Sequence, residues 1–218
     1  MQETILAVGA QASGSNAGAA LVFEYLSATG TWTQLGDMLS GEADGDHFGV
    51  SVALSGDGST VAVGGYFHDG GDQGSLPNAG HVRVFSFTNQ QWMQLGQDID
   101  GVAEQDRAGE RVAISHNGRT VAVAAVLHDG VGGPNSGHVR ILDYDNDAAV
   151  WSQRGSDMDG EDRLDQSGSG IAIYQTRPCP LRPNEKRHWP GMVPSPSDSC
   201  RRRTCPCWED SDSSNPTT

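Results

Sequence analysis

The chain has 218 residues, and its 14 lysines and arginines against 28 aspartates and glutamates give a formal net charge of −14. This length allows one large domain or two small ones, and the negative charge opposes binding to nucleic acid or to anionic membranes. The sequence contains no run of 18 apolar residues, so it predicts no membrane span. Its first residues lack the pattern of a signal peptide, so either the chain is cytoplasmic or its true N-terminus is missing.

An internal repeat of about sixty residues organises the chain. When Trp32 is aligned with Trp92, the segments 32–70 and 92–130 are identical at 19 of 39 positions. A third copy opens at Trp151, and a partial copy, ILAVGAQASGSNAGAALVFEY, precedes Trp32. Repeats of this length are typical of arrays in which each unit buries its apolar face against its neighbour.

Within one period, four short apolar segments are predicted to be strands: 50–54, 60–65, 81–87 and 92–99. The tetrapeptides SGDG (55–58) and SHNG (115–118) join the first two strands, and Gly58 and Gly118 supply the positive φ of a tight hairpin turn. Four antiparallel strands in each repeat form the blade of a β-propeller. We expect the repeated tryptophan to pack between neighbouring blades.

The composition changes near residue 174. All four cysteines and eight of the ten prolines follow this point, and the segment shows no strand or helix period. We therefore predict a propeller domain over 1–174 and a disordered tail over 175–218. The repeat also breaks abruptly after Ile173, which favours the hypothesis that the tail is out-of-frame sequence.

Over about residues 4–173 the chain resembles the FG-GAP repeats of integrin α-subunit-type β-propellers. The "FG" pair occurs as Phe48-Gly49, with weaker copies at Ala108-Gly109 and Ser167-Gly168. The "GAP" motif occurs without its proline, in the pairs Gly9-Ala10, Gly64-Gly65 and Ala124-Ala125. The resemblance implies adhesion or recognition at the cell surface or outside the cell.

The predicted fold class is all-β, a partial β-propeller of about three four-stranded antiparallel blades. Closed propellers usually have four to eight blades, so we expect open blade edges that allow self-association. The calcium loops of the family are shortened here to SGDG and SHNG. Such a loop cannot supply the six to eight oxygens that calcium takes, so we expect no cofactor and no metal site.

The candidate binding face combines the loops between strands two and three (66–79 and 126–136) with the acidic segments that connect consecutive blades. Antiparallel strand order places all of them on one face, which we call the long-loop rim. The candidate binding residues are Asp44, Asp46, His68, Asp69, Asp72, Asp100, Asp106, His128 and Asp129. These residues favour either a cation or ligand site or, more simply, Asp-Gly turns that recur with the blade.

Other polar side chains are weaker candidates for a functional site. We expect His81 and His138, each in the sequence GHVR, to point outward from strand three as surface histidines. Ser115 and His116 are adjacent in one turn, and no Gly-x-Ser-x-Gly motif occurs, so the sequence predicts no nucleophilic catalytic site.

The sequence therefore favours a binding module that is not an enzyme and that recognises a protein or glycan partner through the long-loop rim. One alternative is an extracellular carbohydrate-active propeller, a hydrolase or lyase, which would use paired carboxylates. Another is a nonfunctional truncated gene product with exposed strand edges.

Overall fold

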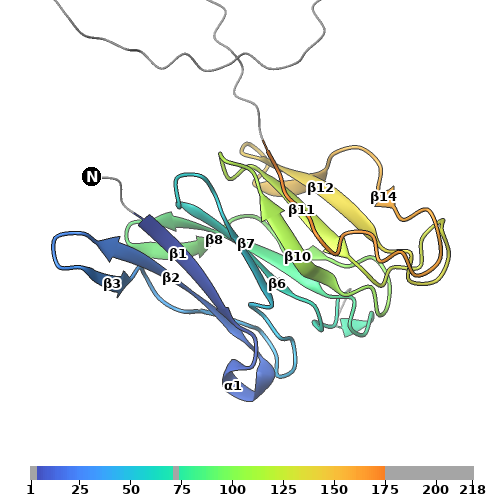
Figure 1. Cartoon of the computed structure of the whole chain (residues 1–218), viewed down its shortest axis with the longest axis horizontal. Helices are drawn as coiled ribbons and strands as arrows, with labels where there is room; N and C mark the ends of the chain where they lie inside the picture. Colours follow the sequence, from blue (N-terminus) through green and yellow to red (C-terminus); the bar gives the residue numbers. More distant parts are fainter. Residues whose placement is uncertain (1–3, 71–73, 175–218) are drawn as a thin grey trace, which may run out of the picture. The chain divides into compact units, whose positions relative to one another are not determined.

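The computed structural model describes residues 4–70 and 74–174. Within them the strands form three antiparallel sheets that lie side by side (Figure 1), and the fold is the predicted all-β partial propeller of three blades. The predicted disordered tail, 175–218, lies outside the described residues. No helix in the described part of the chain is long and apolar enough to span a membrane.

Each sheet follows the predicted order of strands. Blade 1 contains β1 (Thr4–Ala10), the short turn α1 (Ser13–Asn16), β2 (Ala19–Leu26), β3 (Thr31–Gln34) and β4 (Leu39–Ser40). Blade 2 contains β5 (Ser51–Leu54), β6 (Thr60–Gly65), β7 (His81–Thr88), β8 (Gln91–Gln94) and β9 (Ile99–Asp100). Blade 3 contains β10 (Ala108–Ile114), β11 (Thr120–Ala125), β12 (His138–Asp145), β13 (Val150–Gln153) and β14 (Met158–Asp159).

The predicted fourth strand is divided in two. In blade 2, β8 and β9 both pair with β7, one near each end of it. Between them Gly96 has a φ of 78°, which turns the backbone out of the ladder. The end of the third copy, 168–173, is not a strand, although Ile171 and Ile173 pack against buried apolar residues of blade 3.

The predicted turns between the first two strands are confirmed by φ angles of 70° at Gly58 and 67° at Gly118. The Ser55 hydroxyl and the Ser59 amide both donate to the Asp57 carboxylate, at 2.7 and 3.0 Å. In blade 3, Asn117 takes the place of Asp57, and its amide oxygen accepts from the Ser115 hydroxyl at 2.7 Å. Acceptor geometry, and not charge, is what this turn requires.

The hydrophobic core lies between the blades. One cluster joins Ala20 and Val22 of blade 1 to Val61, Val63 and other residues of blade 2, and a second joins blade 2 to blade 3 in the same way. Every residue of β6 and β11 is buried, as expected for strands covered on both faces. A blade is therefore stable only with a neighbour against it.

Tryptophan connects one blade to the next. The indole nitrogen of Trp92 donates to the Leu35 carbonyl of blade 1 at 2.7 Å, and Trp151 donates to Leu95 of blade 2 at 2.6 Å. A side chain at Gly36 would place its Cβ 2.8 Å from the Trp92 ring, so the glycine after the leucine is needed for this contact. Trp32, in blade 1, is 47% exposed, and the predicted packing between blades is confirmed for the other two.

We expect Trp92→Phe to lower the free energy of unfolding by about 2 kcal/mol, because the Leu35 carbonyl loses its donor and apolar contacts are lost. Trp32→Phe is the matched control and should change it by less than about 0.5 kcal/mol. Urea denaturation of both variants measures the difference. Equal effects would show that the indole does not fix the junction.

The Asp57 turn predicts a specific loss of stability in acid. Burial raises the pKa of Asp57, but hydrogen bonds from Ser55 and Ser59 outweigh it and hold the pKa below its ordinary value of 3.8. The ionised form therefore stabilises the fold above pH 3.8, and this contribution is lost as the pH falls through the lower folded-state pKa.

Asp57→Asn should remove this loss of stability at low pH and preserve the turn, as Asn117 does in blade 3. Urea midpoints of wild type and variant, compared at neutral pH and near pH 3, test this. The reciprocal change, Asn117→Asp, should add the same dependence. If the wild-type and Asp57→Asn midpoints fall in parallel, the hydrogen bonds do not favour the carboxylate.

Candidate functional site

The long-loop rim is continuous across the blades. The loop of one blade donates or accepts backbone hydrogen bonds with the connecting segment of the next: Phe48 donates to Ala17 at 3.0 Å, Ala108 to Ala79 at 2.8 Å and Ser167 to Ser136 at 2.8 Å. The same bonds recur at each junction because the repeat places the same backbone groups there. The rim is thus built from both sides of every blade junction.

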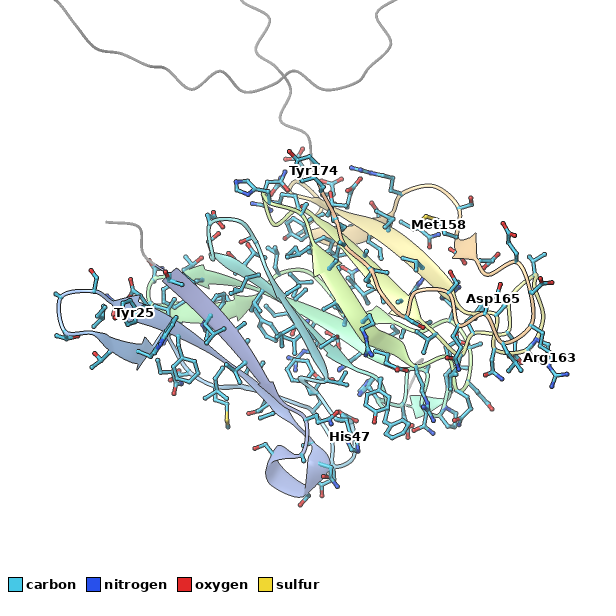
Figure 2. The ribbon with its side chains drawn as sticks, viewed as in Figure 1. Tyr25, His47, Met158, Arg163, Asp165 and Tyr174 are labelled. Atoms are coloured by element: carbon cyan, nitrogen blue, oxygen red, sulfur yellow. The ribbon has the colours of Figure 1, made fainter. Side chains whose placement is uncertain are left out.

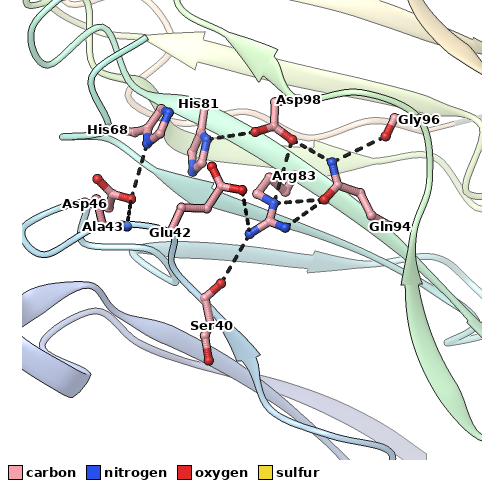
Figure 3. A network of polar contacts seen from close by, with 10 residues as sticks. All are labelled: Ser40, Glu42, Ala43, Asp46, His68, His81, Arg83, Gln94, Gly96 and Asp98. Carbon is pink, nitrogen blue, oxygen red and sulfur yellow. Dashed lines mark hydrogen bonds and ion pairs between the residues drawn. The ribbon is translucent and has the colours of Figure 1, made fainter. Parts of the chain in front are cut away.

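A pair of stacked histidines lies under this rim in blade 2 (Figure 3). His68 follows β6, His81 is the first residue of β7, and their ring centroids are 3.9 Å apart with 15° between the planes. The Nδ1 atom of His68 lies 3.2 Å from an Asp46 carboxylate oxygen. The Nδ1 atom of His81 lies 3.6 Å from the carboxylate of Asp98. Each imidazole therefore faces its own carboxylate.

Blade 3 repeats this arrangement. His128 and His138 stack with ring centroids 3.9 Å apart. His128 Nδ1 lies 3.0 Å from Asp106, and His138 Nδ1 lies 3.5 Å from Asp157. Burial lowers the pKa of His138, and the neighbouring His128 lowers it further, which favours the neutral imidazole.

The prediction that His81 and His138 are surface residues is wrong, because both side chains are fully buried. Alternation along a strand separates two faces, but here each face of the blade is covered by protein. In blade 2, the ring of Phe48 packs edge-on against His81 with centroids 5.9 Å apart. Strand period alone cannot distinguish a solvent-facing side from one that meets another blade.

The register of the split fourth strand brings two carboxylates to each buried histidine. His81 is directly opposite Asp100 in the β7–β9 pair, and His138 is opposite Asp159 in the β12–β14 pair. Asp98 is two residues before Asp100, so both carboxylates lie on the same side of the strand. The sequence signal for this cluster is therefore Asp-x-Asp together with Gly-His.

The two carboxylates of blade 2 have opposite pKa shifts. Burial alone would raise the pKa of Asp98, but contacts with His81, Gln94 and Arg83 together hold that pKa below its ordinary value. Burial raises the pKa of Asp100, and the negative charge of Asp98 adds to this increase. A cation placed between them would favour the ionised form of both.

Arginines connect these clusters to the preceding blade. In Figure 3, the Arg83 guanidinium reaches the Ser40 carbonyl at 3.3 Å and lies 3.5 Å from the Glu42 carboxylate. Arg140 donates in the same way to the Asp100 carbonyl. The polar clusters are therefore held in place from three sides: by their own blade, by the connecting segment and by the neighbouring blade.

The predicted site residues fall into distinct groups. Asp46 and Asp106 are buried and accept from the Ala43 and Ala103 amides, at 2.9 and 2.8 Å. His68 contacts Asp46, and His128 contacts Asp106. Asp100 lies opposite His81 in the β7–β9 pair. Asp69 and Asp129 close their own loops by accepting from the Asn78 and Asn135 amides, Asp44 is exposed, and Asp72 lies outside the described residues.

An aromatic cluster lies on the rim beside the polar one. His47 is 5.5 Å from Tyr66 and 5.2 Å from Phe67, measured between ring centroids, and all three are half-buried. The Arg107 guanidinium lies over the Phe67 ring at 4.9 Å. Figure 2 shows His47 at the rim, on the segment that connects blade 1 to blade 2. Sequence analysis did not single out these aromatic residues.

Residues 32–85, which include most of blade 2 and its junction with blade 1, match the family model described as FG-GAP repeat. This segment is similar to FG-GAP repeats. The resemblance inferred from the sequence is confirmed there, and the FG pair, Phe48-Gly49, lies at the junction. Among curated proteins, none matches the chain.

Several solved structures are similar to the chain. A protein assigned as a 6-phosphogluconolactonase from Bacteroides uniformis has 16% identity and a TM-score of 0.46, and the match covers 72% of this chain and 38% of that protein. One assigned likewise from Bacteroides fragilis has 15% identity, a TM-score of 0.43 and coverages of 67% and 34%. The periplasmic gluconolactonase of Pseudomonas aeruginosa has 18% identity and a TM-score of 0.41, and the match covers 71% of this chain and 39% of the gluconolactonase. The chain spans less than two fifths of the length of each.

The expectation that the chain is not an enzyme is corrected by these similarities, since the similar structures are named as lactonases, which are enzymes. The sequence argument relied on catalytic groups that did not converge, yet the fold brings histidines and carboxylates together. At 15–18% identity no activity passes from those proteins to this one.

Asp106 and Asp165 provide a matched test of the buried carboxylate. Both accept from the amide three residues earlier, but Asp106 is 2% exposed and faces His128, whereas Asp165 is exposed. We expect Asp106→Ala to lower the free energy of unfolding by about 2 kcal/mol, and Asp165→Ala by less than about 1 kcal/mol. Chemical denaturation measures both, and equal losses would show that the histidine contact contributes no stability.

Proposed function

We propose that the chain is a recognition module and that its long-loop rim binds a protein or glycan partner. The observation that carries this proposal is the hydrogen bonding of each blade's loop to the connecting segment of the next blade, at 2.8–3.0 Å. A rim made rigid in this way presents its side chains with little loss of conformational freedom on binding. Long loops on a rigid scaffold are common binding surfaces.

The aromatic cluster supports a contact surface at the junction of blades 1 and 2. The rings of Tyr66 and Phe67 pack against each other with centroids 4.2 Å apart and a tilt of 36° between their planes, and both remain half-exposed. Aromatic residues beside an arginine are typical of the central contacts of binding interfaces. Flat aromatic rings also contact the apolar faces of sugars, so this cluster favours a glycan.

The rim is chemically suited to a neutral or cationic partner. Its exposed carboxylates include Glu42, Asp44, Glu104 and Glu161, and the chain has a net charge of −14. Nucleic acids and anionic lipid surfaces are disfavoured by this charge. The FG-GAP resemblance supports a setting at the cell surface or outside the cell.

A glycan array with the labelled full-length chain tests the proposal. Tyr66→Ala should weaken binding to any glycan that scores by about tenfold or more, since the stacking contact is lost. The control is Gln90→Gly, an exposed residue with a φ of 64° in the turn after β7, on the opposite face. It should bind as wild type does.

One result would narrow this proposal, and another would contradict it. If no glycan binds, the glycan partner is rejected, and a protein partner remains to be tested with the same pair of variants. If Gln90→Gly abolishes binding and Tyr66→Ala does not, the contact surface lies on the face opposite to the rim.

A further inference from the structure

We infer that blades 2 and 3 each bind one divalent transition-metal ion of the zinc class. The ligands are His81, Asp98 and Asp100 in blade 2, and His138, Asp157 and Asp159 in blade 3. This inference concerns the chain alone, and it does not depend on whether the rim has a partner.

The spacing of the ligand atoms fits one ion. In each triad the three ligand atoms lie within 4.8 Å of one another. His81 Nδ1 is 3.6 Å from Asp98, and His138 Nδ1 is 3.5 Å from Asp157. These separations are too long for hydrogen bonds. They are close to the separation of about 3.4 Å between two ligands at 2.0–2.2 Å from a tetrahedral zinc ion.

The buried imidazoles lack other partners. Among the described residues, neither ring nitrogen of His81 or of His138 has a hydrogen-bond partner, and both side chains are fully buried. Burial of unpaired polar nitrogens costs stability. An ion held by Nδ1 would satisfy the nitrogen that faces the carboxylates, and it would also offset the repulsion between the two aspartates.

The second histidine of each pair is suited to hold the ligand histidine in place. His68 is fixed by its contact with Asp46, and its ring covers one face of His81 at 3.9 Å. His128 does the same for His138 from its contact with Asp106. Outer partners that fix the orientation of a ligand ring are usual at metal sites.

The ligand types select the ion. One imidazole and two carboxylates suit zinc and related ions, whereas calcium takes six to eight oxygens. Three protein ligands leave a coordination position for water. The sequence-based expectation of no metal site was argued from the shortened SGDG and SHNG turns. These sites use different residues, near the other face of the blades.

Blade 1 is an internal control. At the positions of His81, Asp98 and Asp100, it carries Ala19, Met38 and Ser40, none of which is a good ligand for zinc. The chain should therefore hold two ions at these sites and not three. The same comparison shows that alanine fits the histidine position, since Ala19 is 1% exposed in a well-packed blade.

The test measures zinc bound per full-length chain after equilibrium dialysis, in wild type, His81→Ala, His138→Ala and the double variant. Each single change should remove one ion and the double change two. Asp98→Asn and Asp157→Asn, at partly exposed positions, should each weaken one site by about tenfold or more. Asp147→Asn, at an exposed position in the turn between β12 and β13, should bind zinc as wild type does.

Two further measurements separate these sites from other metal binding. The four cysteines all follow residue 174, so zinc bound by them is the same in every variant and cancels in the differences. The absorption spectrum of the Co²⁺-loaded wild type, minus that of the double histidine variant, should contain no thiolate charge-transfer bands. Circular dichroism identifies any variant that does not fold. If a histidine variant does not fold, the zinc affinities of Asp98→Asn and Asp157→Asn test the proposal instead.

The proposal is overturned if folded His81→Ala and His138→Ala bind as much zinc as wild type. It is also overturned if the aspartate variants retain full affinity, or if wild type binds no more zinc than the double variant. Absence of glycan binding together with normal zinc binding would reject the glycan partner and leave the metal sites standing.

Discussion

The junction between consecutive blades is the constraint on which the rest of this structure depends. Its apolar core is shared between two blades, and its backbones approach closely. A Cβ on Gly64 would lie 2.0 Å from the Gly109 carbonyl oxygen, and one on Gly49 would lie 2.1 Å from that of Ala19. With positive φ values at Gly49 and Gly109, no other residue fits without strain. The glycine of the FG pair is thus required by the approach of the neighbouring blade.

This junction also determines the chemistry of the polar clusters. A histidine at the start of strand three would be an ordinary exposed side chain in an isolated sheet. Here the connecting segment and the neighbouring blade cover it, so the imidazole loses water and faces carboxylates from its own blade. Burial therefore converts a repeated Gly-His dipeptide into a candidate metal ligand.

The two complete repeats differ in an informative way. Blade 3 has Val102 where blade 2 has Glu42, and Val126 and Leu127 replace Tyr66 and Phe67. The histidine pair and its carboxylates are present in both. The rim surface therefore varies between blades while the buried polar cluster does not, which is the difference expected between a contact surface and an ion site.

The sequence by itself determined the strands, the hairpin turns and the number of blades, because these depend on local period and on residues such as Gly58 that the backbone geometry demands. It also indicated which face carries the long loops, because in an antiparallel blade successive connections alternate between the two faces. Even the division of the fourth strand at Gly96 has a local cause, although the prediction missed it.

Only the tertiary structure decided which polar residues meet. Asp98 and His81 are 17 positions apart in the sequence, yet the strand register and the covering blade bring them together and remove water. Period-two alternation identified two faces for His81 but could not show that both are buried. The convergence comes from strand register within one blade, and the burial comes from contacts with the neighbouring blade. Alternation along one strand shows neither.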